Sequence, residues 1–486
     1  QTEAPIKGAA RGTLYHAFME NLDFSARIRN GADLCFKDRL SVVYHLSLPG
    51  ILAQISEIVM QYIDAAMVGV LGAGASASIG LLSSSTWLFG GAIAACAAGF
   101  SVQVAHAVGA GKEHRAKGIF KQSLLASLLF SLAICAIGVL LSFKLPQGLG
   151  ADQAIWKDAT NYFLFFALFI PVRQINCLCM NMLQCSGNMK VPSIVASIMC
   201  LLDVIFNYFL IFPARTVSLF GNSFEMYGAG LGVTGAQLGT SFATAVSMCI
   251  LLVYAIAKEK KIAFINEEES WIVEKDVLKQ ALHIGVPMAM EQCATTGAQV
   301  VSTRIVAPLG TIAIAANSFA ITAESLCYMP GYGIANASTT MVGQAIGAKR
   351  KDLAKSFAWL TTFTGMIIMT VTGCLMYFLC PYVFAFLTPV KEVQKLGVSV
   401  LRIELLAEPL FAASIVANGA LRGASDTLVP GIINLVSIWG VRITLAYFLS
   451  KTIGLQGAWI AMAVELSVRG ILFLIRLKKE RWLANC

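Results

Sequence analysis

Two acidic side chains interrupt the first long apolar run of the sequence, residues 41–71. Glu57 and Asp64 are seven residues apart. This spacing is about two helical turns, so the two side chains lie on nearly the same helix face, about 10 Å apart along the axis. A charged side chain at bilayer depth costs on the order of 3 kcal/mol and normally faces a protein interior or a watery cavity. We therefore predict that this face lines a cavity.

A second pair of polar side chains stands in the apolar stretch MCLLDVIFNYFLIF. Asp203 and Asn207 are four residues apart, which puts them on one face of a helix. Carboxyl groups in a low-dielectric wall can bind and release a proton or another small cation as their surroundings change. A carboxylate held permanently in a packing hydrogen bond is the structural alternative for Asp64.

The composition indicates an integral membrane protein. Of 486 residues, 57% are hydrophobic and 13% are charged, against about 25% charged residues in a typical soluble chain. The mean hydropathy is +0.72. Twelve apolar runs are long enough to span a bilayer, at residues 41–71, 77–108, 119–143, 159–183, 191–213, 231–257, 277–307, 312–346, 356–387, 397–421, 428–450 and 454–475. We expect an all-α protein with twelve transmembrane helices.

The sequence repeats internally with an offset of 238 residues. This offset brings Pro49 onto Pro287, Leu71-Gly72 onto Leu309-Gly310, Gly109-Ala110 onto Gly347-Ala348, Pro171 onto Pro409, and Val191-Pro192 onto Val429-Pro430. Since an even number of helices separates the copies, the repeat is parallel and its pseudo-twofold axis runs along the membrane normal. We predict two lobes of six helices each.

The resulting division has five parts. They are a polar N-terminal segment at 1–40, an N-lobe at 41–257, a cytoplasmic linker at 258–276, a C-lobe at 277–476 and a basic C-terminal tail at 477–486. The pattern WIVEKDVLKQAL in the linker region is typical of an amphipathic surface helix.

Lysine and arginine gather in the loops after the second, sixth and eighth helices and in the tail. By the positive-inside rule these loops and both termini are expected in the cytoplasm. The net charge of +9 is explained by basic loops facing anionic lipid, without a nucleic-acid partner. The 13 cysteines lack metal-type spacing, and we expect no resident metal.

Several classes of protein are disfavoured by missing motifs. The sequence contains no G-x-x-x-x-G-K-[ST], no H-E-x-x-H and no G-x-S-x-G, which argues against nucleotide-driven transport and against the matching enzymes. A channel usually builds its filter from several copies of one ring. We therefore expect a secondary transporter that works by alternating access, with no enzymatic activity and no cofactor other than a coupling ion, H⁺ or Na⁺.

Short motifs in a fixed order resemble the multidrug and toxic compound extrusion (MATE) family. They include IDAAMVGVLG, LQCSGNMKVP and NYFLIF in the first half, and APLGTIAIAAN, MVGQAIGAK and LRGASDTLVP in the second. The resemblance covers about residues 41–476 and implies a V-shaped exporter of organic, often cationic and amphipathic, compounds. The loop GAGKEHRAKG lacks the Asp-Arg pair of the major facilitator class. A flippase for a lipid-linked precursor is the alternative, although abundant intramembrane carboxylates and few intramembrane Arg and Lys favour a cationic substrate.

The resemblance also implies roles for polar residues in the first lobe. Asp64 falls where some relatives have the aspartate that takes up the coupling ion, and Asp203 and Asn207 stand in exchanged order at a related pair. Asn181 stands where the family can place an amide, with a helix-packing hydrogen bond as the alternative. These oxygens suit a proton relay or a dehydrated Na⁺, a hard cation. Glu57 is either a further coupling residue or a structural one.

In the second lobe, Glu291, Glu324 and Glu408 lie within apolar runs. Glu291 and Glu408 match positions where the family commonly has Glu, or Gln at the latter, and we expect all three to receive a cationic substrate. Helix–helix hydrogen bonding is the alternative, and Arg304 could neutralise one of them. Ser302 stands opposite Asp64 in the repeat, so coupling is expected mainly in the first lobe.

Four prolines recur in pairs under the 238-residue offset: Pro49 with Pro287, and Pro171 with Pro409. We expect them to act as bend points during transport, with ordinary tolerated prolines as the alternative. The expected partners are a small organic substrate and the lipid bilayer. The expected setting is a multi-pass monomer in a bacterial inner membrane.

Overall fold

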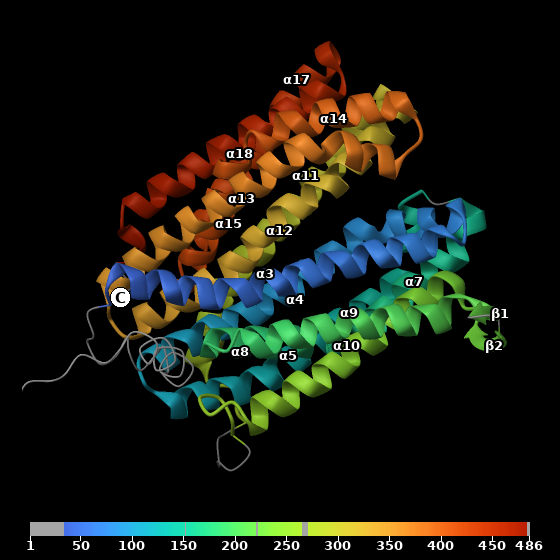
Figure 1. The fold of residues 1–486 in the computed structure, drawn as a ribbon. Coiled ribbons are helices and arrows are strands. Elements are labelled where there is room, and N and C mark those ends of the chain that lie inside the picture. Colours follow the sequence, from blue (N-terminus) through green and yellow to red (C-terminus); the bar gives the residue numbers. More distant parts are fainter. Residues whose placement is uncertain (1–33, 151, 220–221, 265–270, 484–486) are drawn as a thin grey trace, which may run out of the picture.

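The computed structural model describes residues 34–150, 152–219, 222–264 and 271–483. Two bundles of long helices meet at the end near the C-terminus and diverge toward the opposite end (Figure 1). The polar segment expected at 1–40 lies largely outside the described residues. Its described end is part of the core, because Leu34 is buried and a helix begins at Phe36.

The N-lobe contains six membrane-crossing segments, of which the fourth is broken in two. Its elements in chain order are α3 (Phe36–Gly69), α4 (Ala73–Gly109), α5 (Glu113–Ser142), α6 (Leu145–Gly148), η1 (Gln153–Ile155), α7 (Trp156–Leu168), α8 (Ile170–Ser186), α9 (Lys190–Ile211), β1 (Pro213–Leu219), β2 (Asn222–Ala229) and α10 (Gly232–Ala257). The antiparallel hairpin β1–β2 lies between α9 and α10. At the equivalent position of the C-lobe, Gly454 alone separates the two helices, so the 238-residue offset does not hold beyond the hairpin.

The C-lobe follows the same order without the hairpin. Its elements are α11 (Lys275–Val306), η2 (Ala307–Leu309), α12 (Thr311–Gly347), α13 (Lys351–Leu387), α14 (Lys391–Leu405), α15 (Glu408–Gly423), α16 (Leu428–Val436), the π-helical turn η3 (Ser437–Ile443), α17 (Thr444–Ile453), α18 (Leu455–Lys478) and η4 (Arg481–Leu483). The expected all-α architecture of two six-helix lobes is confirmed, and the predicted spans agree with the helices within a few residues.

Among the described residues, nine helices are long and apolar enough to cross a membrane, or ten if the bent pair α7–α8 counts as one span. The other two crossing segments, α11 and α14–α15, are less apolar because they carry polar side chains. These include Glu291 on α11 and the buried Glu404 and Glu408 on α14 and α15. Polar groups in a membrane protein face its interior, so these two segments locate a polar interior in the C-lobe.

The first helix of each lobe begins inside the other lobe. Val43 and Leu46 at the start of α3 belong to a buried cluster with Met341, Phe357 and Leu421 of the C-lobe. Val277 and Ala281 at the start of α11 belong to a cluster whose other helices are in the N-lobe, namely α4, α5, α8, α9 and α10. This exchange buries apolar surface between the lobes near their shared end, which helps to hold that end together.

One sequence-based expectation for the linker needs correction. The linker does not contain a separate surface helix in its described part, because residues 275–306 form the single helix α11. Trp271 instead contacts Phe264, which packs against Phe120 of α5.

The described part of the basic tail packs against the protein. Trp482 is almost fully buried, and its indole N–H donates to the Leu477 carbonyl at 3.1 Å.

Candidate functional site

The N-lobe brings Asp64, Asp203 and Asn207 together. The Asn207 amide Nδ2 donates to Asp64 Oδ1 at 2.7 Å and to Asp203 Oδ2 at 3.0 Å. Asp203 and Asn207 are fully buried, whereas Asp64 is half-buried. We call these three residues the triad. It joins α3 to α9, the pair of helices on which the sequence pattern placed them.

The two carboxyl groups of the triad lie close together, because both accept from the same Asn207 amide nitrogen. A direct hydrogen bond between them would need a proton on one of them. Two carboxylates this close in a buried site repel each other, which favours a proton or another small cation at the pair. The arrangement is chemically able to take up one such cation.

The sequence analysis missed the positive charge beside the triad. Arg173 of α8 interacts electrostatically with Glu57, Asp64 and Asp203, and its guanidinium carbon lies 5.0 Å from the centre of the Phe166 ring. Arg173 stands in the apolar run 159–183, so the rule that singled out intramembrane carboxylates would also have found it. Its charge offsets part of the negative charge on this face.

Glu57 and Asn181 are placed differently from the triad. Glu57 is exposed on α3 and feels the charge of Arg173. Asn181 directs its Nδ2 to Cys177 Sγ, one turn earlier in α8, at 3.9 Å. Within the described part of the chain, no hydrogen bond joins Asn181 to Asp64 or Asp203. The structure does not bring Asn181 to the triad.

A cluster of buried carboxylates lies in the C-lobe. Glu324 of α12, Glu404 of α14 and Glu408 of α15 interact electrostatically with one another, and Arg442 of η3 faces Glu324 and Glu404. Both carboxylate oxygens of Glu404 and of Glu408 are buried without a hydrogen-bond partner among the described residues. We call these three glutamates the C-lobe cluster; the sequence analysis missed Glu404.

Glu291 belongs to a separate place in the same lobe. Its Oε1 accepts hydrogen bonds from Asn434 Nδ2 at 2.5 Å and from Asn418 Nδ2 at 3.2 Å. Arg422 interacts with it electrostatically. The three glutamates expected to receive substrate therefore occupy two sites rather than one.

The positive charges of the C-lobe also differ from expectation. Arg304 is exposed in the last turn of α11, so it does not neutralise a buried glutamate. Arg469 instead pairs with the fully buried Glu465 at 3.1 Å, and Arg422 and Arg442 are half-buried. With Arg173 and the half-buried Arg402 of α14, five arginines stand in the interior of the spans, more than the sequence comparison of acidic and basic residues assumed.

The four prolines fall into two structural classes. Pro171 and Pro409 stand in the first turns of α8 and α15, directly after a break in the helix, and α7 and α8 meet at 49°. Pro49 and Pro287 lie inside the unbroken helices α3 and α11. The described residues contain no group of three or more His, Cys, Asp and Glu side chains able to hold a metal ion.

Three comparisons relate this geometry to known proteins. The model of the family named MatE matches residues 49–209 and 287–448, two segments whose starts are 238 residues apart. A probable multidrug resistance protein NorM from Mannheimia succiniciproducens is 26% identical over 448 residues, covering 89% of this chain and 92% of the relative. The protein of the same description from Thermotoga maritima is also 26% identical, covering 90% and 92%.

Solved structures match the fold over nearly the whole chain. A crystal structure described as MATE in complex with MaL6 superposes with a TM-score of 0.85 at 18% identity, covering 96% of this chain and 99% of that one. A MOP superfamily transporter from Pyrococcus furiosus, described as having a binding pocket of reverse polarity, gives a TM-score of 0.84 at 17% identity, covering 94% and 98%. At such identities the likeness shows the fold alone.

Proposed function

This chain belongs to the MatE family, whose model matches both halves of this multi-pass membrane protein, and we propose that it is a multidrug efflux transporter that exchanges organic cations for H⁺ or Na⁺. The named relatives, probable multidrug resistance proteins, support export of drug-like compounds. The choice of coupling ion and of cationic substrates rests on the chemistry of the two lobes.

The triad is the observation that carries the proposal. The Asn207 amide nitrogen donates to Asp64 Oδ1 at 2.7 Å and to Asp203 Oδ2 at 3.0 Å. In this proposal, the pair of carboxyl groups takes up one small cation. A proton satisfies this site by joining the two carboxyl groups, and Na⁺ satisfies it through hard oxygen ligands. Because α3 and α9 each supply a carboxylate, loading and unloading the cation changes the force between these two helices.

Aromatic rings beside acidic side chains support an organic cation as the substrate. Tyr328 on α12 contacts Phe411 and Tyr332, with ring centroids 5.6 and 6.0 Å apart. Tyr328 and Glu324 are one helical turn apart on α12. A ring face attracts a cation, and a nearby carboxylate adds a full charge. We assign substrate binding to this region, with Glu291, Glu324 and Glu408 as the acidic groups.

The proposed cycle is antiport. With the separated end open, the triad binds the coupling ion, α3 bends near Pro49, and the organic cation leaves. The lobes then rock, with Pro171, Pro287 and Pro409 as further bend points, and the ion is released on the other side. Substrate and ion must each bind the two states with different affinity, because otherwise neither could drive the other.

The basic loops lie at the joined end, after α4, α10 and α12. We propose that this end faces the cytoplasm, with both termini, in a bacterial inner membrane, and that the protein works as a monomer. Glu57, near Arg173, is proposed to tune the triad from the same face of α3.

The test is efflux of a fluorescent organic cation from proteoliposomes under an imposed pH gradient or an imposed Na⁺ gradient. We expect wild-type flux to follow one gradient and Asp64→Asn to abolish it. Asp352→Asn changes an exposed carboxylate outside the interior and serves as the matched control. Flux that survives in Asp64→Asn would move the coupling site elsewhere, with Glu291 and Glu408 next.

The second candidate is a flippase for a lipid-linked precursor. The five interior arginines favour it, because a phosphorylated headgroup needs positive charge. If neither gradient moves the organic cation, but the protein speeds the transfer of a fluorescent phosphorylated lipid between leaflets, this alternative replaces the exporter.

A further inference from the structure

The joined end of the molecule is closed where α4 of the N-lobe crosses α12 of the C-lobe (Figure 1). Both helices end there, at Gly109 and Gly347. These glycines are equivalent under the 238-residue offset. The contacts around them repeat in the same way, and the seam is therefore a pseudo-twofold structure.

Three cross-lobe hydrogen bonds of α4 and α12 with α15 and α8 span this seam. Thr340 Oγ1 of α12 donates to the Gln184 carbonyl of α8 at 3.1 Å, and the other two are equivalent under the offset. His106 Nε2 of α4 lies 2.7 Å from the Gly423 carbonyl at the end of α15, and it is the donor because the acceptor is a carbonyl. Gln344 Nε2 of α12 donates to the Cys185 carbonyl near the end of α8 at 2.9 Å. The offset brings His106 onto Gln344 and Cys185 onto Gly423. Each lobe therefore uses the same position to hold the same carbonyl of the other lobe.

Glycine permits the close approach that these bonds require. A Cβ atom at Gly109 would collide with the backbone carbonyl of Gln344, and one at Gly347 would collide with that of His106. In both cases the obstacle is backbone, which cannot rotate away as a flexible side chain can. The two helices cross in direct contact at the very residues whose side chains make the cross-lobe bonds.

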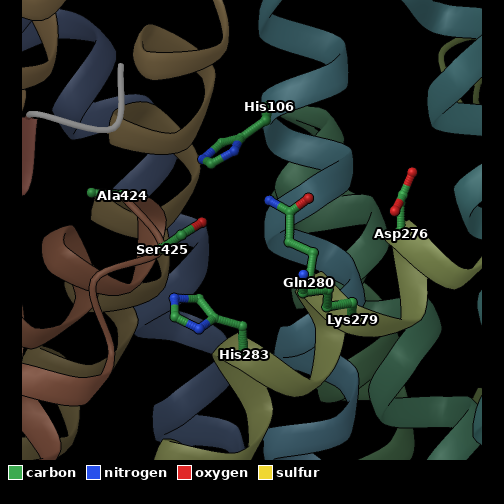
Figure 2. A pocket seen from close by; sticks show the side chains of 7 residues that line it. All are labelled: His106, Asp276, Lys279, Gln280, His283, Ala424 and Ser425. Carbon is green, nitrogen blue, oxygen red and sulfur yellow. The ribbon is translucent and has the colours of Figure 1, made fainter.

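The two equivalent bonds differ in their access to water. Gln344 is fully buried. His106 is half-buried and borders a cavity of about 580 Å³ that Asp276, Lys279, Gln280, His283, Ala424 and Ser425 also line. Figure 2 shows the His106 ring directed toward Ala424 and Ser425, with Gln280 and His283 on the facing helix. Water in this cavity can replace the Gly423 carbonyl as the partner of His106, whereas the Gln344 amide has no such substitute nearby.

We propose that His106 and Gln344 are paired clasps that hold the lobes together at this end, and that the His106 clasp opens first in each transport cycle. The proposal rests on alternating access as set out above, since an exporter must open this end once per cycle. Neither residue binds substrate or ion. Both are positioning residues that set the balance between the states open at one end and at the other.

The test is amide hydrogen exchange in lipid nanodiscs, without substrate or gradient, on peptides covering 104–112, 183–189, 341–350 and 420–427. Loss of one net hydrogen bond, in His106→Ala or Gln344→Ala, should speed exchange about five- to tenfold. Because both clasps close the same seam, each variant should speed exchange in all four segments, and most in the segment whose carbonyl it releases. The double variant should show about the product of the two effects.

Two further variants separate a clasp from a packing effect. His106→Gln copies the side chain of the second lobe, so it should restore wild-type exchange. Thr339→Val removes bonds of Thr339 to Ala335 and Gly419, both in its own lobe, and should leave the seam unchanged. Should His106→Ala fail to fold, His106→Asn takes its place, because its shorter side chain cannot reach Gly423.

Three results would overturn the proposal. They are wild-type exchange in both alanine variants, an effect confined to the segment next to each substitution, and failure of His106→Gln to restore closure. Wild-type exchange that is faster at 183–189 than at 420–427 would reverse the order of opening. None of these readouts measures transport. A failed efflux assay would therefore contradict the proposed function without contradicting the proposal for His106 and Gln344.

Discussion

The two lobes share a backbone plan but distribute their buried charges in unrelated ways. The N-lobe concentrates Asp64, Asp203 and Asn207 in one hydrogen-bonded triad. In the C-lobe, the repeat-equivalent residues of this triad are Ser302, Val441 and Leu445. The C-lobe instead spreads its acidic groups over the cluster of Glu324, Glu404 and Glu408, the pair of Glu465 with Arg469, and Glu291 with two asparagines.

Under the proposed function, this difference divides ion binding and substrate binding between the two lobes. A compact pair of carboxylates on two helices suits one small ion, whereas separated carboxylates among aromatic rings suit a larger and more variable ligand. The local backbone follows the same division. Where α9 carries Asp203 on a regular helix, the equivalent part of the C-lobe is the π-helical turn η3, which carries Arg442.

The largest effect is expected from breaking the buried ion pair of the C-lobe. Arg469→Met removes the direct ion-pair partner of the fully buried Glu465 and leaves only the charge of Arg442 near it. This should lower the free energy of unfolding by about 3 kcal/mol. The measurement is the unfolding transition in detergent micelles. Arg173→Met breaks no direct ion pair among the described residues, so it should lower the free energy of unfolding by less. Equal decreases in the two variants would contradict this difference between the lobes.

The next effect concerns the triad. Asp203→Asn removes a charge-assisted hydrogen bond worth about 1.5–3 kcal/mol, so ion-driven efflux should fall roughly 10- to 100-fold. Since the carboxyl groups act as one unit, Asp64→Asn combined with Asp203→Asn should be no worse than Asp64→Asn alone. Initial rates in proteoliposomes measure this. Effects that multiply in the double variant would mean two independent ion sites.

A smaller effect is expected from the C-lobe cluster. Glu408→Gln keeps the size of the side chain but removes a charge, which should weaken binding of a fluorescent organic cation about tenfold, equivalent to 1.4 kcal/mol. Equilibrium titration measures the change, and the dependence of efflux on the ion gradient should persist. If Glu408→Gln abolished the dependence of efflux on the ion gradient and left the affinity for the organic cation unchanged, the C-lobe cluster would be the ion site instead of the substrate site.

The smallest effect is expected outside both sites. Arg350 and Asp352 form an exposed pair at 2.9 Å, and such pairs contribute little because water screens them. Asp352→Asn should change the free energy of unfolding by less than about 0.5 kcal/mol and leave efflux unaltered. A large loss would show that the loop after α12 takes part in holding the lobes together.

The sequence was sufficient for the spans, the repeat and the pairing of Asp203 with Asn207, because these depend on local periodicity. Helical spacing places Asp203 and Asn207 on one face regardless of the rest of the fold. That Asp64 lies near these two residues was predicted from the family resemblance alone. Spacing could not predict it, because contacts between α3 and α9 depend on tertiary packing.

The remaining features could not be read from spacing. Asn181 donates to Cys177 of its own helix, and Glu291 accepts from one asparagine of α15 and one of α16. Both depend on the rotation of each helix about its axis, which is set by the neighbouring helices. The π-helical turn and the start of each lobe's first helix in the opposite lobe also arise from packing over long distances in the sequence. Arg173 was the exception, because its type and depth were visible in the sequence.

The glycine crossing of α4 and α12 has a consequence for the energy supply of the membrane. A bilayer that stores an ion gradient is an electrical insulator, and every protein in it is a potential leak. Backbone packed directly on backbone leaves no space for a chain of water along which protons could pass. In the proposed antiport cycle, the bare contacts of Gly109 and Gly347 would help to keep the gradient charged between transport events, at a place where the two lobes would also part.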